Sequence, residues 1–130
     1  MSSWPPAVLL GTPQDVMRQI FRGMLRACGV RNAELRSSCE DVLAVLQDKS
    51  RRWDILILDG SFQEIPKALR AIKEEAGTQL RVVLVFSALT REEILAAKDA
   101  GADDFMVYPV SQAVLESRLR KLMEPAMTAR

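Results

Sequence analysis

The stretch that most constrains this chain runs from Trp53 to Ser61 and reads WDILILDGS. Four branched aliphatic residues in a row, Ile55 to Leu58, lie between two aspartates, a pattern typical of a strand covered on both faces. The run ends at Asp59. Open α/β sheets bind ligands at the carboxyl ends of their parallel strands, so we expect any chemical site to be centred on Asp59. The alternative is that Asp59 only turns the strand into the next loop.

Short apolar segments and amphipathic segments alternate along the rest of the chain. Four further segments are predicted as strands: Ala7–Leu10, Ala33–Arg36 at a sheet edge, Val82–Phe86 and Asp103–Tyr108. Five are predicted as helices: Thr12 to Cys28, Ser38 to Leu46, Pro66 to Ala76, Thr90 to Gly101, and Ser111 to Leu122. This alternation predicts an α/β, flavodoxin-like (βα)5 three-layer sandwich, with a parallel sheet in the order 2-1-3-4-5.

The first helix carries the most detailed local signals. Its start is predicted from Thr12 as N-cap, Pro13 at the first helical position and Asp15 in the first turn. Its core stripe is predicted to comprise Val16, Met17, Ile20, Phe21, Met24, Leu25 and Cys28, and that of the last helix Val114, Leu115, Leu119 and Leu122. On the other side of the first helix, three arginines recur every four residues and form either a basic docking stripe or a solvated face: Arg18, Arg22 and Arg26.

Composition excludes several classes of function. The 130 residues fit one domain over 1–130, with an extended arm at 1–6 and a frayed tail at 124–130. Basic (18) and acidic (17) residues balance, so no nucleic-acid or membrane partner is expected. No histidine is present, which removes histidine-based metal sites, histidine-dependent nucleophiles and phosphohistidine chemistry. Cys28 and Cys39 lack metal-like spacing and are expected to pack in a reducing compartment. The first apolar run is too short for a signal peptide, so we expect a cytoplasmic location.

Several segments, in the right order and spacing, resemble the receiver domain of bacterial response regulators, the CheY-like family. They are Met17 to Gly29, WDILILD ending at Asp59, LVFSA around Ser87, and AGADDFMVYP from Ala100 to Pro109. The resemblance implies that Asp59 matches the aspartate that accepts a phosphoryl group from a histidine kinase. It also implies that Ser87 matches the hydroxyl residue that follows the phosphoryl group, and Phe105 the aromatic that changes rotamer on activation.

The departures from the family concern the phosphorylation chemistry. The acidic pair after the first strand falls on Thr12 and Pro13, and the lysine of the fifth strand falls on Tyr108. The loop after Asp59 is about two residues shorter than usual. A magnesium site would retain only Asp59, with the carbonyl of Ser61, so we expect no resident cofactor and weak Mg²⁺ binding at best.

Two groups of residues keep alternative interpretations. The Tyr108 ring either covers the vacated acidic pocket, with its hydroxyl donating to Asp59 or Ser87, or simply packs with a solvated hydroxyl. A further three residues match positions that form charged pairs across an interface in the winged-helix class of response regulators, or are ordinary surface charge: Asp103, Asp104 and Arg118.

The sequence therefore predicts a degenerate receiver domain of two-component signalling, not an enzyme, that acts as a protein-interaction module. Its expected partner is a histidine kinase, effector or output protein, bound at the surface of the fourth helix, fifth strand and fifth helix; a homodimer is an alternative. One rival function is a phospho-receiver that still accepts phosphate on Asp59. The other is a flavodoxin-like domain that binds a nucleotide or flavin, although the Gly11-Thr12-Pro13 turn lacks a phosphate-cradling glycine-rich loop.

Overall fold

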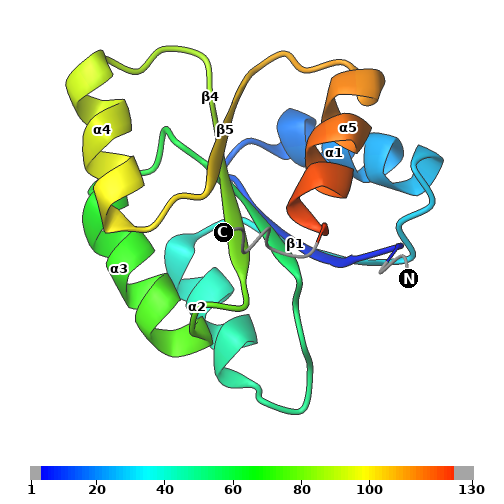
Figure 1. The fold of residues 1–130 in the computed structure, drawn as a ribbon, viewed down its shortest axis with the longest axis horizontal. Coiled ribbons are helices and arrows are strands. Elements are labelled where there is room, and N and C mark those ends of the chain that lie inside the picture. Colours follow the sequence, from blue (N-terminus) through cyan, green and yellow to red (C-terminus); the bar gives the residue numbers. More distant parts are fainter. Residues whose placement is uncertain (1–3, 125–130) are drawn as a thin grey trace, which may run out of the picture.

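The computed structural model describes residues 4–124, in which five strands alternate with five helices. The elements are β1 (Ala7–Gly11), α1 (Asp15–Ala27), β2 (Asn32–Arg36), α2 (Cys39–Gln47), β3 (Ile55–Asp59), α3 (Ile65–Ala76), β4 (Arg81–Phe86), α4 (Arg91–Ala100), β5 (Asp104–Val107) and α5 (Gln112–Leu122). The strands form one parallel sheet in the order β2-β1-β3-β4-β5 (Figure 1), which confirms the predicted flavodoxin-like fold. Residues 1–3 of the predicted arm and 125–130 of the predicted tail lie outside the described residues.

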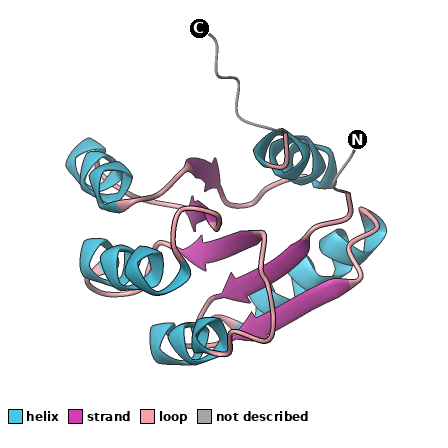
Figure 2. Ribbon diagram, turned by 60° about the horizontal axis from the view of Figure 1, so that its bottom comes forward, coloured by secondary structure: helices cyan, strands magenta, loops and turns pink. Residues whose placement is uncertain are grey.

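Helices cover both faces of the sheet (Figure 2). Strand β3 supplies core residues to both layers. Leu56 and Leu58 pack under α2, α3 and α4, whereas Ile55 and Ile57 pack under α1 and α5. All four side chains are fully buried, and each contributes about 1.5–3 kcal/mol by leaving water. The predicted strand covered on both faces is confirmed.

Helix α1 begins later than predicted. Its N-cap is Gln14, whose side chain makes no capping hydrogen bond, so Thr12 is not the N-cap and Pro13 lies before the first turn. The physical reason is that Thr12 continues the strand: its N–H donates to the carbonyl of Arg36 at 3.0 Å, one step beyond the pairing of β1 with β2. The prediction that Asp15 lies in the first turn is confirmed.

The core stripes of α1 and α5 are narrower than predicted. Val16 is 69% exposed, Ile20 42% and Val114 46%. Met17, Phe21, Leu25 and Cys28 of the predicted α1 stripe are buried, as are Leu115 and Leu119 of the predicted α5 stripe. Each helix contacts the sheet on one side only, and a residue next to a buried position is turned about 100° away from it.

Both cysteines pack as predicted, and neither forms a disulfide. Cys28 is buried and Cys39 is half-buried against the core under α2. Burial raises the pKa of both thiols above the ordinary value, which makes them poorer nucleophiles. Within residues 4–124, no helix combines the length and apolar character that crossing a bilayer requires.

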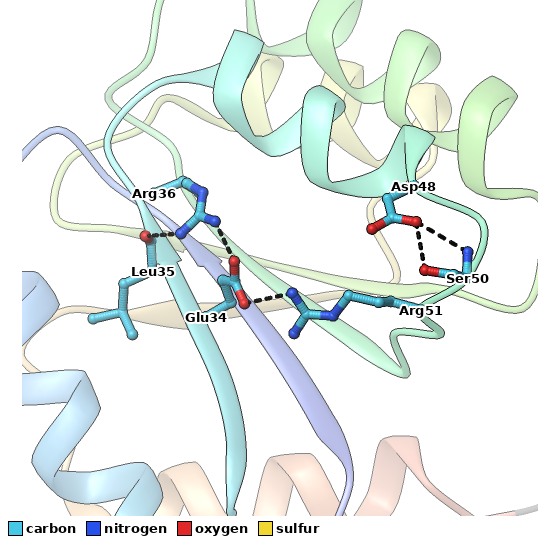
Figure 3. Close-up of polar contacts among 6 residues, drawn as sticks. All are labelled: Glu34, Leu35, Arg36, Asp48, Ser50 and Arg51. Carbon is cyan, nitrogen blue, oxygen red and sulfur yellow. Dashed lines mark hydrogen bonds and ion pairs between the residues drawn. The ribbon is translucent and has the colours of Figure 1, made fainter.

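A charged cluster ties the loop between α2 and β3 to the edge strand β2 (Figure 3). The Nη1 atom of Arg51 lies 2.8 Å from one carboxylate oxygen of Glu34, and Arg36 pairs with the other oxygen. In the same loop, the N–H and hydroxyl of Ser50 both donate to Asp48, at 3.1 and 2.6 Å. Burial by itself would raise the pKa of Glu34, but the two arginines hold that pKa below its ordinary value of 4.5.

The lowered pKa of Glu34 predicts a pH-dependent contribution to stability. A carboxylate whose pKa is lower in the folded state stabilises the fold above its unfolded pKa, and this contribution is lost as the pH falls through the folded pKa. We expect Glu34→Gln to lower the free energy of unfolding at pH 7 by about 1 kcal/mol, and this deficit to shrink as the pH falls below 4.5. Urea denaturation from pH 7 to pH 3 measures both effects. Glu74→Gln, at an exposed position on α3, is the matched control, and an equal deficit at all pH values would contradict the prediction.

Candidate functional site

A cleft of about 510 Å³ lies at the carboxyl ends of β3 and β4, the end of the sheet that the sequence predicts for the site. It is enclosed by the start of α1, the β3–α3 loop and the β4–α4 loop. Its lining includes the apolar residues Met17, Phe62, Leu84, Phe86 and Leu89 and the carboxylates of Asp59, Glu64 and Glu93. None of the described residues that line it is a lysine or arginine.

Asp59 lies at the base of this cleft and is only 3% exposed. The Thr12 hydroxyl donates to its Oδ2 at 2.6 Å, and the backbone N–H of Ser61 donates to its Oδ1 at 2.8 Å. Each carboxylate oxygen therefore accepts a hydrogen bond, which a buried charged group requires. Gly60 continues the sheet, because its N–H donates to the carbonyl of Val85 at 2.7 Å.

Sheet register brings Thr12 to Asp59. Gly11 pairs with Leu58, so the next residue on each strand lies beside the other. Thr12 is fully buried, and besides donating to Asp59 its hydroxyl accepts from the N–H of Gln14 at 3.2 Å. A threonine thus occupies, as a neutral donor, a position where the family has a carboxylate.

Arg18 also contacts the turn that contains Thr12, between β1 and α1. Its Nη1 donates to the carbonyl of Thr12 at 2.7 Å, and its Nη2 pairs with Asp15 at 3.1 Å. Arg18 therefore does not belong to a free basic stripe, whereas Arg22 and Arg26 are exposed on α1. The sequence did not reveal this role, because four-residue spacing describes a helix face and not the loop that precedes it.

The structure brings together only part of the predicted site. Asp59, Ser61 and Ser87 line one cleft, and Ser87 is exposed there. Pro13 is exposed and does not line the cleft. Phe105 lies outside the cleft, half-buried on the α2–α3–α4 side of the sheet, with its ring centroid 6.3 Å from that of Phe86 in an edge-to-face arrangement. Phe86 does line the cleft and so connects the two.

Tyr108 adopts the packing alternative. Its ring centroid lies 6.2 Å from that of Phe21, and it packs among the core residues under α1 and α5. In the described part of the chain its hydroxyl donates to neither Asp59 nor Ser87, and the residue does not line the cleft. The structure thus shows the ring packed against Phe21 of α1, and Tyr108 is not among the residues that line the cleft.

The charged residues around β5 pair within the chain. Asp103 accepts from Lys73 at 2.8 Å and from the N–H of Val82 at 2.7 Å, and thereby ties α3 to β4. Asp104 pairs with Arg118 of α5 at 2.7 Å. Asp103 therefore stabilises the fold through its contacts with α3 and β4. The Asp104–Arg118 ion pair lies at the surface.

The donors beside Asp59 do not fit a magnesium ion. Mg²⁺ takes six oxygens and is usually held by one or two carboxylates with carbonyls, waters and phosphate. Here Thr12 brings a hydroxyl that already donates to Asp59, and Pro13 brings no donor. Among residues 4–124, no group of three or more acidic, cysteine or histidine side chains is placed to hold a metal ion.

Removing the Thr12 hydroxyl should expose its coupling to Asp59. Thr12→Val keeps the shape of the side chain and leaves Oδ2 of a buried carboxylate unpaired, so we expect the free energy of unfolding to fall by about 1.5–3 kcal/mol. In an Asp59→Asn background the same change should cost at least about 1 kcal/mol less, since no charge is left unpaired. Chemical denaturation of the four variants measures this coupling. Equal costs in both backgrounds would show that the hydrogen bond does not carry the effect.

Comparison with known proteins gives similarity in both sequence and fold. No protein-family model matches the chain. The chain is 27% identical over 120 residues to the chemotaxis protein CheY of Pseudomonas aeruginosa, which covers 90% of this chain and 95% of that protein. It is 26% identical over 122 residues to the chemotaxis protein CheY-3 of Vibrio cholerae, covering 90% and 91%. The receiver domain of the Pseudomonas aeruginosa sensor histidine kinase PA1611, solved with a magnesium ion in its active-site cleft, aligns with a TM-score of 0.79 at 20% identity and covers 91% of this chain and 97% of that domain.

Proposed function

Since this chain is a CheY-like receiver domain of two-component signalling, we propose that it works mainly as a protein-interaction module independent of phosphorylation, and not as an enzyme. The observation that carries the proposal is the state of Asp59: the carboxylate is buried, and Thr12 and Ser61 occupy its two oxygens. Both hydrogen bonds stabilise the carboxylate in its resting state, which makes either oxygen a poorer nucleophile toward a phosphoryl group.

The surroundings of Asp59 also oppose the reaction electrostatically. Phosphoryl transfer to a carboxylate requires cations that offset the charge on the phosphoryl oxygens, normally Mg²⁺ and a lysine ammonium. The described lining of this cleft offers Glu64 and Glu93 and neither lysine nor arginine. Loss of both cationic groups should cost several kcal/mol of transition-state stabilisation, on the order of a thousandfold in rate.

Restoring the missing groups should restore the chemistry. We expect the wild-type domain to bind Mg²⁺ weakly and to gain little phosphate on Asp59. A triple variant, Thr12→Asp, Pro13→Asp and Tyr108→Lys, should gain both, because it adds two carboxylates for the metal and one ammonium for the phosphoryl oxygens. The single changes should do little, since a lone carboxylate at position 12 replaces a donor to Asp59 with a like charge. Mg²⁺ titration and labelling with acetyl phosphate measure the two properties.

Asp59→Asn is the control for labelling at the intended residue. If the wild type labels readily in Mg²⁺ and Asp59→Asn does not, the domain is a slow phospho-receiver. The flavodoxin-like alternative would be indicated by bound flavin or nucleotide in the purified protein. Its weakness is that Asp59, Glu64 and Glu93 would repel a nucleotide phosphate in this cleft.

The surface that best fits a signalling partner lies on α4, β5 and α5. Each of these elements exposes an aliphatic side chain: Leu95 is 49% exposed, Val107 61% and Val114 46%. Phe105 lies beneath, against Phe86, whose neighbour Ser87 lines the Asp59 cleft. Without phosphorylation to bias these residues, we infer that the surface is fixed in one state and binds a histidine kinase, effector or output protein.

A charge introduced into this surface should disrupt binding selectively. We expect Val107→Glu to weaken capture of the partner at least about tenfold, because burying an unpaired carboxylate at an interface is unfavourable. Val16→Glu is the matched control, since Val16 is a similarly exposed valine on α1. Affinity capture from the native host, followed by chemical-shift mapping with the captured protein, provides the measurement. Shifts confined to Arg18, Arg22 and Arg26 would contradict the prediction, and loss of self-association in Val107→Glu would identify a homodimer.

A further inference from the structure

A second, smaller cleft lies at the opposite end of β3 from Asp59. It has a volume of about 160 Å³ and is bounded by the end of α2, the α2–β3 loop, the end of α3 and the α3–β4 loop. Its lining residues are Leu46, Lys49, Arg51, Arg52, Trp53, Ala76, Gln79 and Leu80. This lining contains three cations and, among the described residues, no carboxylate.

The cleft is lined by a buried side chain with an unused hydrogen-bond donor. Trp53 is 8% exposed, and its indole N–H is buried with no acceptor in the described part of the chain. By contrast, the indole N–H of Trp4 donates to the carbonyl of Cys28 at 3.1 Å. Leaving a buried donor unpaired costs about 1–3 kcal/mol, so an acceptor that reached the indole N–H from the cleft would stabilise the fold.

Two of the three cations already have acidic partners. Lys49 pairs with Glu75 at 2.7 Å, and its ammonium also donates to the carbonyls of Leu46 and Glu75. Arg51 pairs with Glu34 (Figure 3), and its guanidinium lies 4.5 Å from the centre of the Trp53 ring. Arg51 therefore lies over the indole and shares the carboxylate of Glu34 with Arg36.

Arg52 differs from both. Its Nη2 donates to the side-chain oxygen of Gln79 at 3.1 Å, a neutral partner, and it forms no ion pair within residues 4–124. This hydrogen bond also orients the amide of Gln79, whose NH₂ group remains a donor. The cleft thus combines one uncompensated cation with two neutral donors, from Gln79 and Trp53.

We propose that this cleft is a binding site for a small oxyanion, a phosphate or carboxylate group. Such a group only accepts hydrogen bonds, and it would take them from the free N–H groups of Arg52, the amide of Gln79 and the indole of Trp53. The volume suits a single group of this kind, since pockets for larger organic ligands are about 300–1,000 Å³. A bound anion would connect the α2–β3 loop to the α3–β4 loop and stabilise the fold by linkage.

The indole signals of the protein provide a direct test. The chain has two tryptophans, so its ¹⁵N-labelled form gives one indole signal for Trp53 and one for Trp4. We titrate with sodium phosphate and, separately, with sodium acetate, at constant ionic strength held by sodium chloride. The Trp53 signal should move downfield and saturate in the millimolar range in at least one arm while the Trp4 signal stays in place. The arm that saturates at lower concentration shows whether phosphate or carboxylate is the preferred group.

Two variants connect the signal to the site. Arg52→Gln should raise the dissociation constant at least about tenfold, because it removes the uncompensated charge, whereas Arg22→Gln at an exposed position on α1 should leave it unchanged. Trp53→Phe removes the indole donor, so the rise in melting temperature produced by the anion should fall relative to wild type. If Trp53→Phe fails to fold, the comparison of the two arginine variants still decides.

The proposal is overturned if the Trp53 signal is unmoved by both anions. It is also overturned if chloride alone produces the same shift, or if Arg52→Gln and Arg22→Gln titrate alike. In each case the cleft would be a solvent-filled depression whose indole donor is satisfied by water.

Discussion

Strand β3 is closed off from water on both faces, and the arrangement of every other element follows from that burial. Alternate residues of Ile55 to Leu58 face opposite helical layers, so neither layer can be lost without exposing part of the strand. β3 also lies between β1 and β4, which fixes its register on both sides. Asp59 ends this strand in the interior of the fold, so its carboxylate needs hydrogen-bond donors at that position.

That charge is satisfied by hydrogen bonds from two segments of the chain. A threonine hydroxyl and a backbone N–H now pair with Asp59. Arg18 fixes the carbonyl of the same threonine, so the turn after β1 is held from both sides. Tyr108, at the position of the family's lysine, has become a core residue against Phe21. Within the described residues, the turn after β1 and the end of β3 are thus joined by hydrogen bonds at the base of the cleft.

The two ends of β3 have opposite electrostatic character. The cleft at its carboxyl end is lined by Asp59, Glu64 and Glu93, and the smaller cleft before its amino end by Lys49, Arg51 and Arg52. The numbers of acidic and basic residues in the whole chain are nearly equal, yet the two clefts differ in the sign of their charge. Because opposite charges attract at short range, the anion site that we propose lies at the basic end of the strand and not at the acidic end.

Local patterns in the sequence determined the fold class, the element order and the central position of β3, because periodicities of two and 3.6 residues directly reflect burial. They also placed Asp59, Ser61 and Ser87 at one end of the sheet. These patterns could not determine contacts between residues that lie far apart in the sequence. Thr12 looked like a helix cap, and only the register of β1 against β3 made its hydroxyl a donor to Asp59.

The same limit applies at the other misread positions. Val16 is exposed because of how α1 packs against the sheet and α5. The spacing of apolar residues within α1 does not predict this packing. Sequence spacing also does not show that the indole N–H of Trp53, near the meeting point of the α2–β3 and α3–β4 loops, has no acceptor among residues 4–124. Sequence patterns specify which residues are apolar and how often they recur, whereas hydrogen-bond partners across tens of residues are decided by tertiary packing.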